Sequence, residues 1–150
     1  RPLSLVVEFV DHTSTLFDAS LSGPYLNSST ASQTMGVDCI ALTKKYFEVW
    51  NAHDVAGIQG LHAATSSLAD WDASHGPTNE AVAKGIEGIW KAVPDIKIEI
   101  LDIYTMGDKS STCVTNIKVI VDADTTLKVC DVIEYDESGL VVSLNAYKTD

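Results

Sequence analysis

The sequence has little positive charge and almost no arginine. Ten Lys and Arg residues stand against 21 Asp and Glu residues, which gives a formal net charge of −11. Arg1 is the single arginine, and the densest basic spot is the pair Lys44 and Lys45. Nucleic acids and anionic membrane surfaces are bound by clustered Lys and Arg side chains, so we expect neither as a partner.

Cysteine is also scarce, and no long apolar run occurs. The three cysteines, Cys39, Cys113 and Cys130, are widely spaced and odd in number, which favours reduced thiols and a cytoplasmic location. The apolar stretch 3–10 is far shorter than the roughly 20 residues that span a membrane. Because the chain begins with Arg1 rather than Met, we expect a fragment or a processed product.

Several motifs of catalytic chemistry are missing. The four histidines and the acidic residues show no H-x-x-x-H or similar ligand spacing, so we predict no metal site. No glycine-rich phosphate loop occurs, and no nucleophile elbow supports Ser-His-Asp chemistry. We therefore expect a protein that uses no cofactor.

The composition fits one folded domain that follows an arm. A hydrophobic fraction of 45% in 150 residues is ordinary for a single globular domain. Residues 18–34 are rich in Ser, Thr, Gly and Asn, which is typical of a loop or linker. We predict that residues 1–35 form an N-terminal arm or linker and that residues 36–150 form the domain.

The spacing of apolar residues predicts three helices in the first half of the domain. The first covers residues 37–50. Asp54 is a suitable N-cap for the second, on whose surface we place His62. Thr78 is a suitable N-cap for the third, and Pro94 ends it because proline cannot continue a helix.

Strict alternation predicts four strands in the second half, over 96–106, 112–121, 125–135 and 140–147. Upstream, we interpret 66–70 as a short segment and 71–77 as a loop. The short turns between the strands favour an antiparallel meander. Helices followed by such a meander indicate an α+β fold with the helices on one face of a curved sheet.

One acidic residue stands on an apolar strand face. Read with a period of two, Asp131 shares its face with Leu127, Val129, Ile133 and Tyr135. A carboxylate there must be paired, hydrogen-bonded or protonated, because an isolated buried charge is very costly. A protonated Asp131 would be a hydrogen-bond donor, which is a catalytic tool. The alternative is that Asp131 lies at a strand end or pairs with a buried polar group.

Three further residues are candidates for a site. Asp70 is next to Trp71, whose indole can remove water from the carboxylate and make it more basic. The alternative for Asp70 is a loop residue that caps nearby backbone groups. Tyr46 on the first helix is either part of a site or only a core aromatic. His75 is either an acid or base at a cavity mouth or an exposed loop residue.

Residues 46–54 and 131–139, together with Asn145-Ala146-Tyr147, follow a recognisable pattern. In these stretches the chain resembles the NTF2-like superfamily, which includes SnoaL-like proteins and ketosteroid isomerases. The resemblance covers residues 37–150. It implies an α+β cone of three helices on a curved, mainly antiparallel sheet that encloses a cavity for a small apolar molecule. It also implies a homodimer that pairs through the open sheet face.

The bacterial ketosteroid isomerases are the nearest match within that superfamily. The resemblance implies that Asp70 is the general base and that Tyr46 and a protonated Asp131 form the oxyanion hole. Other residues are predicted to contact the substrate, namely Trp50, Trp71, His75, Trp90, Val129 and Ile133. The proline usual after the base is replaced by Trp71-Asp72, so Asp72 is a competing base and the substrate need not be a steroid.

These expectations predict a small-molecule enzyme of the isomerase, cyclase or lyase type that acts on a carbonyl-activated, apolar substrate. The alternative is a non-catalytic ligand-binding or dimerisation module, because a fold does not determine a function. Water-mediated epoxide opening, known from another branch of the superfamily, is disfavoured. It requires an Asp-Arg-Asp group, and the one arginine is Arg1.

Overall fold

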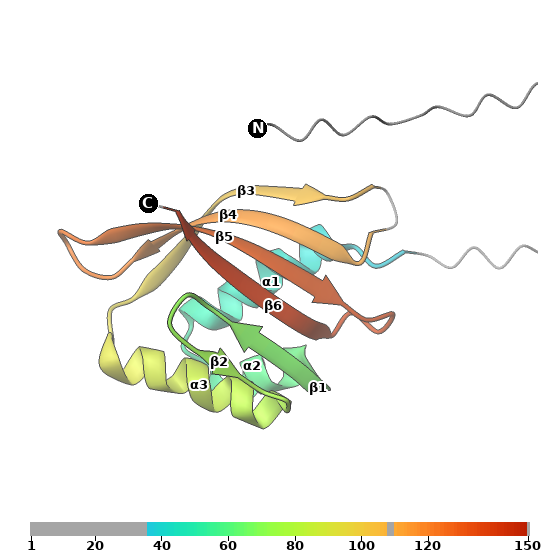
Figure 1. Ribbon diagram of the computed structural model, residues 1–150, viewed down its shortest axis with the longest axis horizontal. Helices are drawn as coiled ribbons and strands as arrows, with labels where there is room; N and C mark the ends of the chain where they lie inside the picture. The colour runs from blue at the N-terminus through green and yellow to red at the C-terminus, as the bar shows by residue number, and fades with distance from the viewer. Residues whose placement is uncertain (1–35, 108–109, 150) are drawn as a thin grey trace, which may run out of the picture. The chain divides into compact units, whose positions relative to one another are not determined.

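The described part of the chain forms three helices and one six-stranded sheet (Figure 1). The computed structural model describes residues 36–107 and 110–149, and the predicted arm over residues 1–35 lies outside the described residues. The helices are α1 (Cys39–Asn51), α2 (Val55–Leu61) and α3 (Asn79–Ala92). The strands are β1 (His62–Ala69), β2 (Ser74–His75), β3 (Lys97–Thr105), β4 (Thr112–Ile120), β5 (Thr126–Tyr135) and β6 (Val141–Thr149).

Side-chain caps begin α2 and α3 where the sequence predicts them. Asp54 accepts a hydrogen bond from the backbone N–H of Gly57 at 2.9 Å, and Thr78 accepts one from that of Ala81 at 3.2 Å. Each bond satisfies a backbone donor that has no partner within its helix. Helix α3 ends at Ala92, shortly before Pro94. The predicted starts of these two helices and the predicted end of α3 are confirmed.

The sheet has the strand order β2-β1-β6-β5-β4-β3. Strands β3 to β6 form the predicted antiparallel meander, and β1 pairs with β6 in parallel. Figure 1 shows the curved strands bent over the helices, which lie on one side of the sheet. The predicted α+β fold of three helices on a curved, mainly antiparallel sheet is confirmed.

The segment between α2 and α3 differs from the prediction. It contains strand β1 and the short strand β2, which pair with each other, instead of a short segment and a loop. Of the eight residues of β1, only His62, Ser66 and Leu68 are buried, so the strand has almost no apolar pattern. The placement of His62 on a helix surface was wrong, because His62 begins β1 and is 2% exposed.

Polar contacts fix both halves of α1 against the sheet. Near its start, Thr43 Oγ1 and Tyr135 Oη form a buried hydrogen bond of 2.8 Å to β5. At its end, the Asn51 side chain accepts from the backbone N–H of Ile98 and donates to the Ile98 carbonyl, both at 2.8 Å. The side chains of α1 that face the sheet are therefore held in fixed positions.

Removing the Tyr135 hydroxyl should destabilise the domain. In Tyr135→Phe the buried hydroxyl of Thr43 loses its partner, so the free energy of unfolding should fall by about 1–3 kcal/mol. The double variant Thr43→Val/Tyr135→Phe should cost less than the sum of the two single variants, since it leaves no group unpaired. Urea denaturation measures these values, and strictly additive costs would contradict the hydrogen bond.

Candidate functional site

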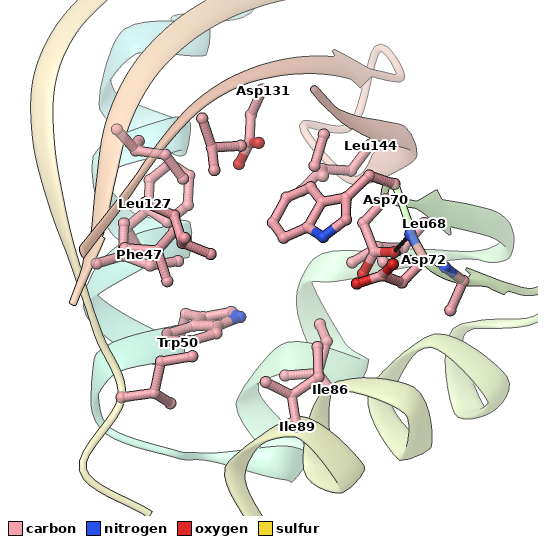
Figure 2. Close-up of a pocket in the computed structure, with 18 of the residues that line it drawn as sticks. Phe47, Trp50, Leu68, Asp70, Asp72, Ile86, Ile89, Leu127, Asp131 and Leu144 are labelled. Atoms are coloured by element: carbon pink, nitrogen blue, oxygen red, sulfur yellow. Dashed lines mark hydrogen bonds between the residues drawn. The ribbon is translucent and has the colours of Figure 1, made fainter. Parts of the chain in front are cut away.

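An apolar cavity of about 340 Å³ lies between the sheet and helices α1 and α3. Most of its wall consists of aliphatic side chains, among them Ile86, Ile89, Ile98, Ile117, Val129 and Leu144. Figure 2 shows Ile86 and Ile89 of α3 across the open space from Asp131 and Leu144 of the sheet. A concave, mostly apolar pocket with few polar groups is the usual form of a small-molecule site.

Strand β5 brings Asp131 into this cavity. Buried and less buried residues alternate along the strand, and Asp131 is on the buried face, where it is 3% exposed. Its carboxyl group points into the open space in Figure 2. Burial raises the pKa of Asp131 from 3.8 to about 7, because the charged form loses its hydration. A large fraction of this carboxyl group is therefore protonated at neutral pH and can donate a hydrogen bond.

Helix α1 carries Tyr46 to the same cavity. The side chain is 1% exposed. Burial and then the nearby charge of Asp131 raise the Tyr46 pKa far above its ordinary value, so the hydroxyl stays protonated. Among the described residues its hydrogen bond is with His62, whose Nε2 lies 3.3 Å from the Tyr46 hydroxyl oxygen. Tyr46 and Asp131 are thus two protonatable groups that line one apolar space.

Asp70 reaches the cavity from the turn that follows β1. Its Oδ1 accepts hydrogen bonds from the backbone N–H groups of Asp72 at 2.7 Å and Ala73 at 2.6 Å. The capping role that the sequence left open is therefore present. Figure 2 shows Asp70 and Asp72 side by side, away from Asp131. With Oδ1 committed to the turn, Oδ2 is the Asp70 oxygen left for a bound molecule.

Four of the six residues predicted to contact a substrate line the cavity, namely Trp50, Trp71, His75 and Val129. Trp50 is buried on α1, and Val129 precedes Asp131 on the inner face of β5. Trp71 is 42% exposed and lies on the turn that Asp70 caps, so it borders the opening. The Trp71 indole, which stands where ketosteroid isomerases usually have a proline after the base, therefore forms part of the cavity wall.

Trp90 and Ile133 are not among the residues that line this cavity, and their contact with a substrate stays a prediction. The Trp90 ring packs against the rings of Trp50 and His53, at centroid distances of 5.6 and 4.8 Å. Trp90 lies in the last turn of α3. Ile133 is fully buried and is paired with Cys113 of β4, which is fully buried as well.

Three buried side chains that have an unpaired polar atom within the described part of the chain were not recognised from the sequence. They are Thr115, which is paired with Asp131 across β4 and β5, and His62 and Ser66 of β1. One side-chain polar atom of each is buried without a hydrogen-bond partner among the described residues, as is Oδ1 of Asp131. The alternation along β4 was a usable signal for Thr115, whereas the unrecognised strand β1 hid the other two.

The expected absences of a metal site and of a membrane partner stay predictions. Within residues 36–107 and 110–149, no group of three or more His, Cys, Asp or Glu side chains could hold a metal ion. The helices of that same region are too short or too polar to cross a membrane. The expected homodimer and the cytoplasmic location likewise stay predictions.

Comparisons with known proteins point to one family. A family model described as a SnoaL-like domain matches residues 43–144, while no curated protein matches the chain. Among solved structures, an NTF2-like protein of unknown function from Cytophaga hutchinsonii ATCC 33406 is 10% identical and has a TM-score of 0.62. The alignment covers 75% of this chain and 91% of that protein.

Two further structures carry provisional enzyme names. A protein from Sinorhizobium meliloti, provisionally named a polyketide cyclase, is 16% identical with a TM-score of 0.62, over 71% of this chain and 93% of that one. A protein from Kribbella flavida DSM 17836, provisionally named a ketosteroid isomerase, is 15% identical with a TM-score of 0.62, over 75% and 78%. At these identities the similarity shows a common fold.

Two glycines of α3 form a matched pair that tests the position of His75. A methyl group at Gly85 would overlap the imidazole of His75, whereas at Gly88 it would meet open space. Glycine within a helix costs about 0.5–1 kcal/mol relative to alanine, so Gly88→Ala should raise the free energy of unfolding by that amount. Gly85→Ala should bring no such gain, because it displaces His75 from the cavity wall.

Urea denaturation of the two variants measures the difference. An equal gain in stability from Gly85→Ala and Gly88→Ala would show that His75 does not lie against α3.

The burial of Asp131 should make the stability of the domain depend on pH. Its pKa of about 7 in the folded state lies above the ordinary value of 3.8. The folded state therefore holds more protons between these two values, and this contribution to stability is lost as the pH rises through that range. Asp131→Asn has no charge to bury, so it should match the wild type near pH 4 and exceed it at pH 8 by about 2–4 kcal/mol.

Urea denaturation of Asp131→Asn and of the wild type at both pH values measures this difference. The pH dependence of stability contributed by the other acidic residues is the same in both proteins and is removed by the subtraction. A stability difference that is the same at pH 4 and pH 8 would rule out a raised pKa for Asp131.

Proposed function

The chain belongs to the SnoaL-like domain family of the NTF2-like superfamily, and we propose that it is an isomerase or cyclase that activates a carbonyl compound without a cofactor. The observation that carries the proposal is that two buried groups with raised pKa values, Tyr46 and Asp131, line one apolar cavity together with the carboxyl group of Asp70, which lies apart from Asp131 in Figure 2. The names of the structural relatives from Sinorhizobium meliloti and Kribbella flavida support the same class of reaction.

In the proposed first step Asp70 acts as the general base. Its Oδ2 takes a proton from the carbon next to the substrate carbonyl, the C–H electron pair forms a C=C bond, and the carbonyl π electrons move to oxygen. The resulting enolate oxygen accepts hydrogen bonds from Asp131 and Tyr46. Such donors in a dry site lower the barrier most where charge develops, and removal of one typically costs about 3–4 kcal/mol.

The second step decides between the two reaction types. In an isomerase, Asp70 returns the proton to a different carbon of the conjugated enolate. In a cyclase, the enolate re-forms its C=O bond as its carbon attacks a second carbonyl carbon of the same molecule, and the new alkoxide takes up the proton held by Asp70. Both outcomes use the same base and the same oxyanion donors, so the shape of the substrate selects between them.

The cavity favours an uncharged or cationic substrate. Among the described residues that line it, none is Lys or Arg, while Asp70, Asp72 and Asp131 are all present. A permanently anionic group away from the donors Tyr46 and Asp131 would therefore meet the carboxylates of Asp70 and Asp72 without a compensating cation. The aliphatic wall requires a body that is largely apolar. We propose a neutral, apolar ketone as the substrate class.

A non-catalytic ligand-binding module is the second candidate. The observation in its favour is that Oδ1 of Asp70 holds the turn through two backbone hydrogen bonds, which is a sufficient structural reason for an acid at this position. On that reading the cavity binds an apolar molecule and leaves it unchanged.

Proton transfer by the wild-type protein tests the proposal directly. A panel of β,γ-unsaturated cyclic ketones should be converted to the conjugated enones, followed by ultraviolet absorbance. Asp70→Asn should lower kcat by several orders of magnitude, because the amide cannot take up the proton while its oxygen still caps the turn. Asp131→Leu should lower kcat by about 10²–10³-fold, because one oxyanion donor is lost.

Asp102→Asn is the matched control, since Asp102 is an exposed acid on β3, and it should keep full activity. Binding of the ketones without conversion or deuterium exchange by the wild type would favour the ligand-binding module. Full turnover in Asp131→Leu would exclude the oxyanion role of Asp131.

A further inference from the structure

We propose that His62 is a positioning residue whose Nε2–H donates a hydrogen bond to the Tyr46 hydroxyl oxygen and thereby turns the hydroxyl hydrogen toward the cavity. The inference rests on the proposed function, in which Tyr46 donates to the substrate oxygen. It assigns a role to a side chain that does not line the cavity and that the proposed reaction steps do not use.

The contact joins two elements that are separate in the sequence. Tyr46 lies in the middle of α1, and His62 is the first residue of β1. The distance between His62 Nε2 and the Tyr46 hydroxyl oxygen is 3.3 Å, and the rings meet edge to face with centroids 5.6 Å apart. His62 is 2% exposed and Tyr46 is 1% exposed, so bulk water does not compete for this bond.

His62 is uncharged in the folded protein at neutral pH. Burial lowers its pKa from 6.5 to about 4, because the charged imidazolium would lose its hydration. A neutral imidazole has one ring N–H, either on Nδ1 or on Nε2. The position of that single proton decides which way the Tyr46 hydroxyl points.

With the proton on Nδ1, the Nε2 lone pair would accept the Tyr46 hydroxyl hydrogen. Tyr46 would then have no hydrogen left for a substrate. In addition, Nδ1 is buried without a partner among the described residues, and an unpaired buried N–H is rare because it costs about 1–3 kcal/mol.

With the proton on Nε2, His62 donates to the Tyr46 oxygen and leaves only the Nδ1 lone pair unpaired. The Tyr46 hydroxyl hydrogen is then free to point at a substrate oxygen in the cavity, which Tyr46 lines. A hydroxyl that accepts one hydrogen bond is also a stronger donor in the next one. This arrangement leaves no ring N–H of His62 unpaired and supplies the donor that the reaction needs.

The tautomer of His62 in the wild-type protein tests the bond without reference to activity. Nuclear magnetic resonance of ¹⁵N-histidine-labelled protein distinguishes a ring nitrogen that carries a hydrogen from one that does not, and loss of the signals in His62→Gln assigns them. We expect the Nε2–H tautomer. An Nδ1–H tautomer or a charged ring at pH 7 would overturn the proposal.

Binding of 4-nitrophenolate, whose charged oxygen resembles that of an enolate, tests the functional consequence. Tyr46→Phe should weaken binding by about tenfold or more, the size expected for one hydrogen bond to a charged group. His62→Leu should weaken it comparably, and the double variant no further than Tyr46→Phe alone. His62→Gln should recover most of the affinity, because its side-chain amide can donate in place of Nε2–H.

These measurements separate the two proposals. Unchanged binding in His62→Leu, or effects of His62→Leu and Tyr46→Phe that add, would overturn the role of His62 and leave the proposed function standing. A wild-type protein that binds no phenolate and converts no ketone would instead remove the proposed function, and with it any role of His62 in the reaction. If His62→Leu does not fold, as judged by circular dichroism, the wild-type tautomer and the affinity of His62→Gln decide the question.

Discussion

The burial of one carboxyl group, that of Asp131, is the constraint on which the site depends. A charged carboxylate is costly on an apolar wall, so burial in the cavity raises the pKa of Asp131 and favours its protonated form. The same burial keeps Tyr46 protonated and His62 neutral. One physical cause, burial away from water, therefore sets the protonation of Asp131 on β5, Tyr46 on α1 and His62 on β1.

Much of this could be predicted from the sequence where local periodicity is strong. The alternation along β5 was sufficient to place Asp131 on the inner face, because the side-chain period of a strand is two. The prediction failed at β1, where most positions are small or polar and the strand is recognisable only once β6 and β2 lie beside it. Since His62 belongs to that strand, the sequence could not reveal its contact with Tyr46.

The sequence also could not tell how far the cavity extends. Ile133 and Trp90 have the residue types and spacing of wall residues, yet they do not line the cavity. Ile133 is paired with Cys113 in the sheet, and the Trp90 ring packs against Trp50 and His53. Whether an apolar side chain borders a void or fills one depends on the neighbours that other elements supply. Cavity walls are therefore less predictable from periodicity than strand faces are.

The two sides of the site are supported differently. The donors lie on rigid elements, because α1 is tied to the sheet through Thr43 and Tyr135 at its start and Asn51 and Ile98 at its end. Asp70 and Trp71 instead lie on a turn held by the carboxylate of Asp70 itself. In the proposed reaction, changes in that turn would alter the opening and the proposed base without moving the proposed donors, so oxyanion stabilisation would depend on the fold and substrate choice on the turn.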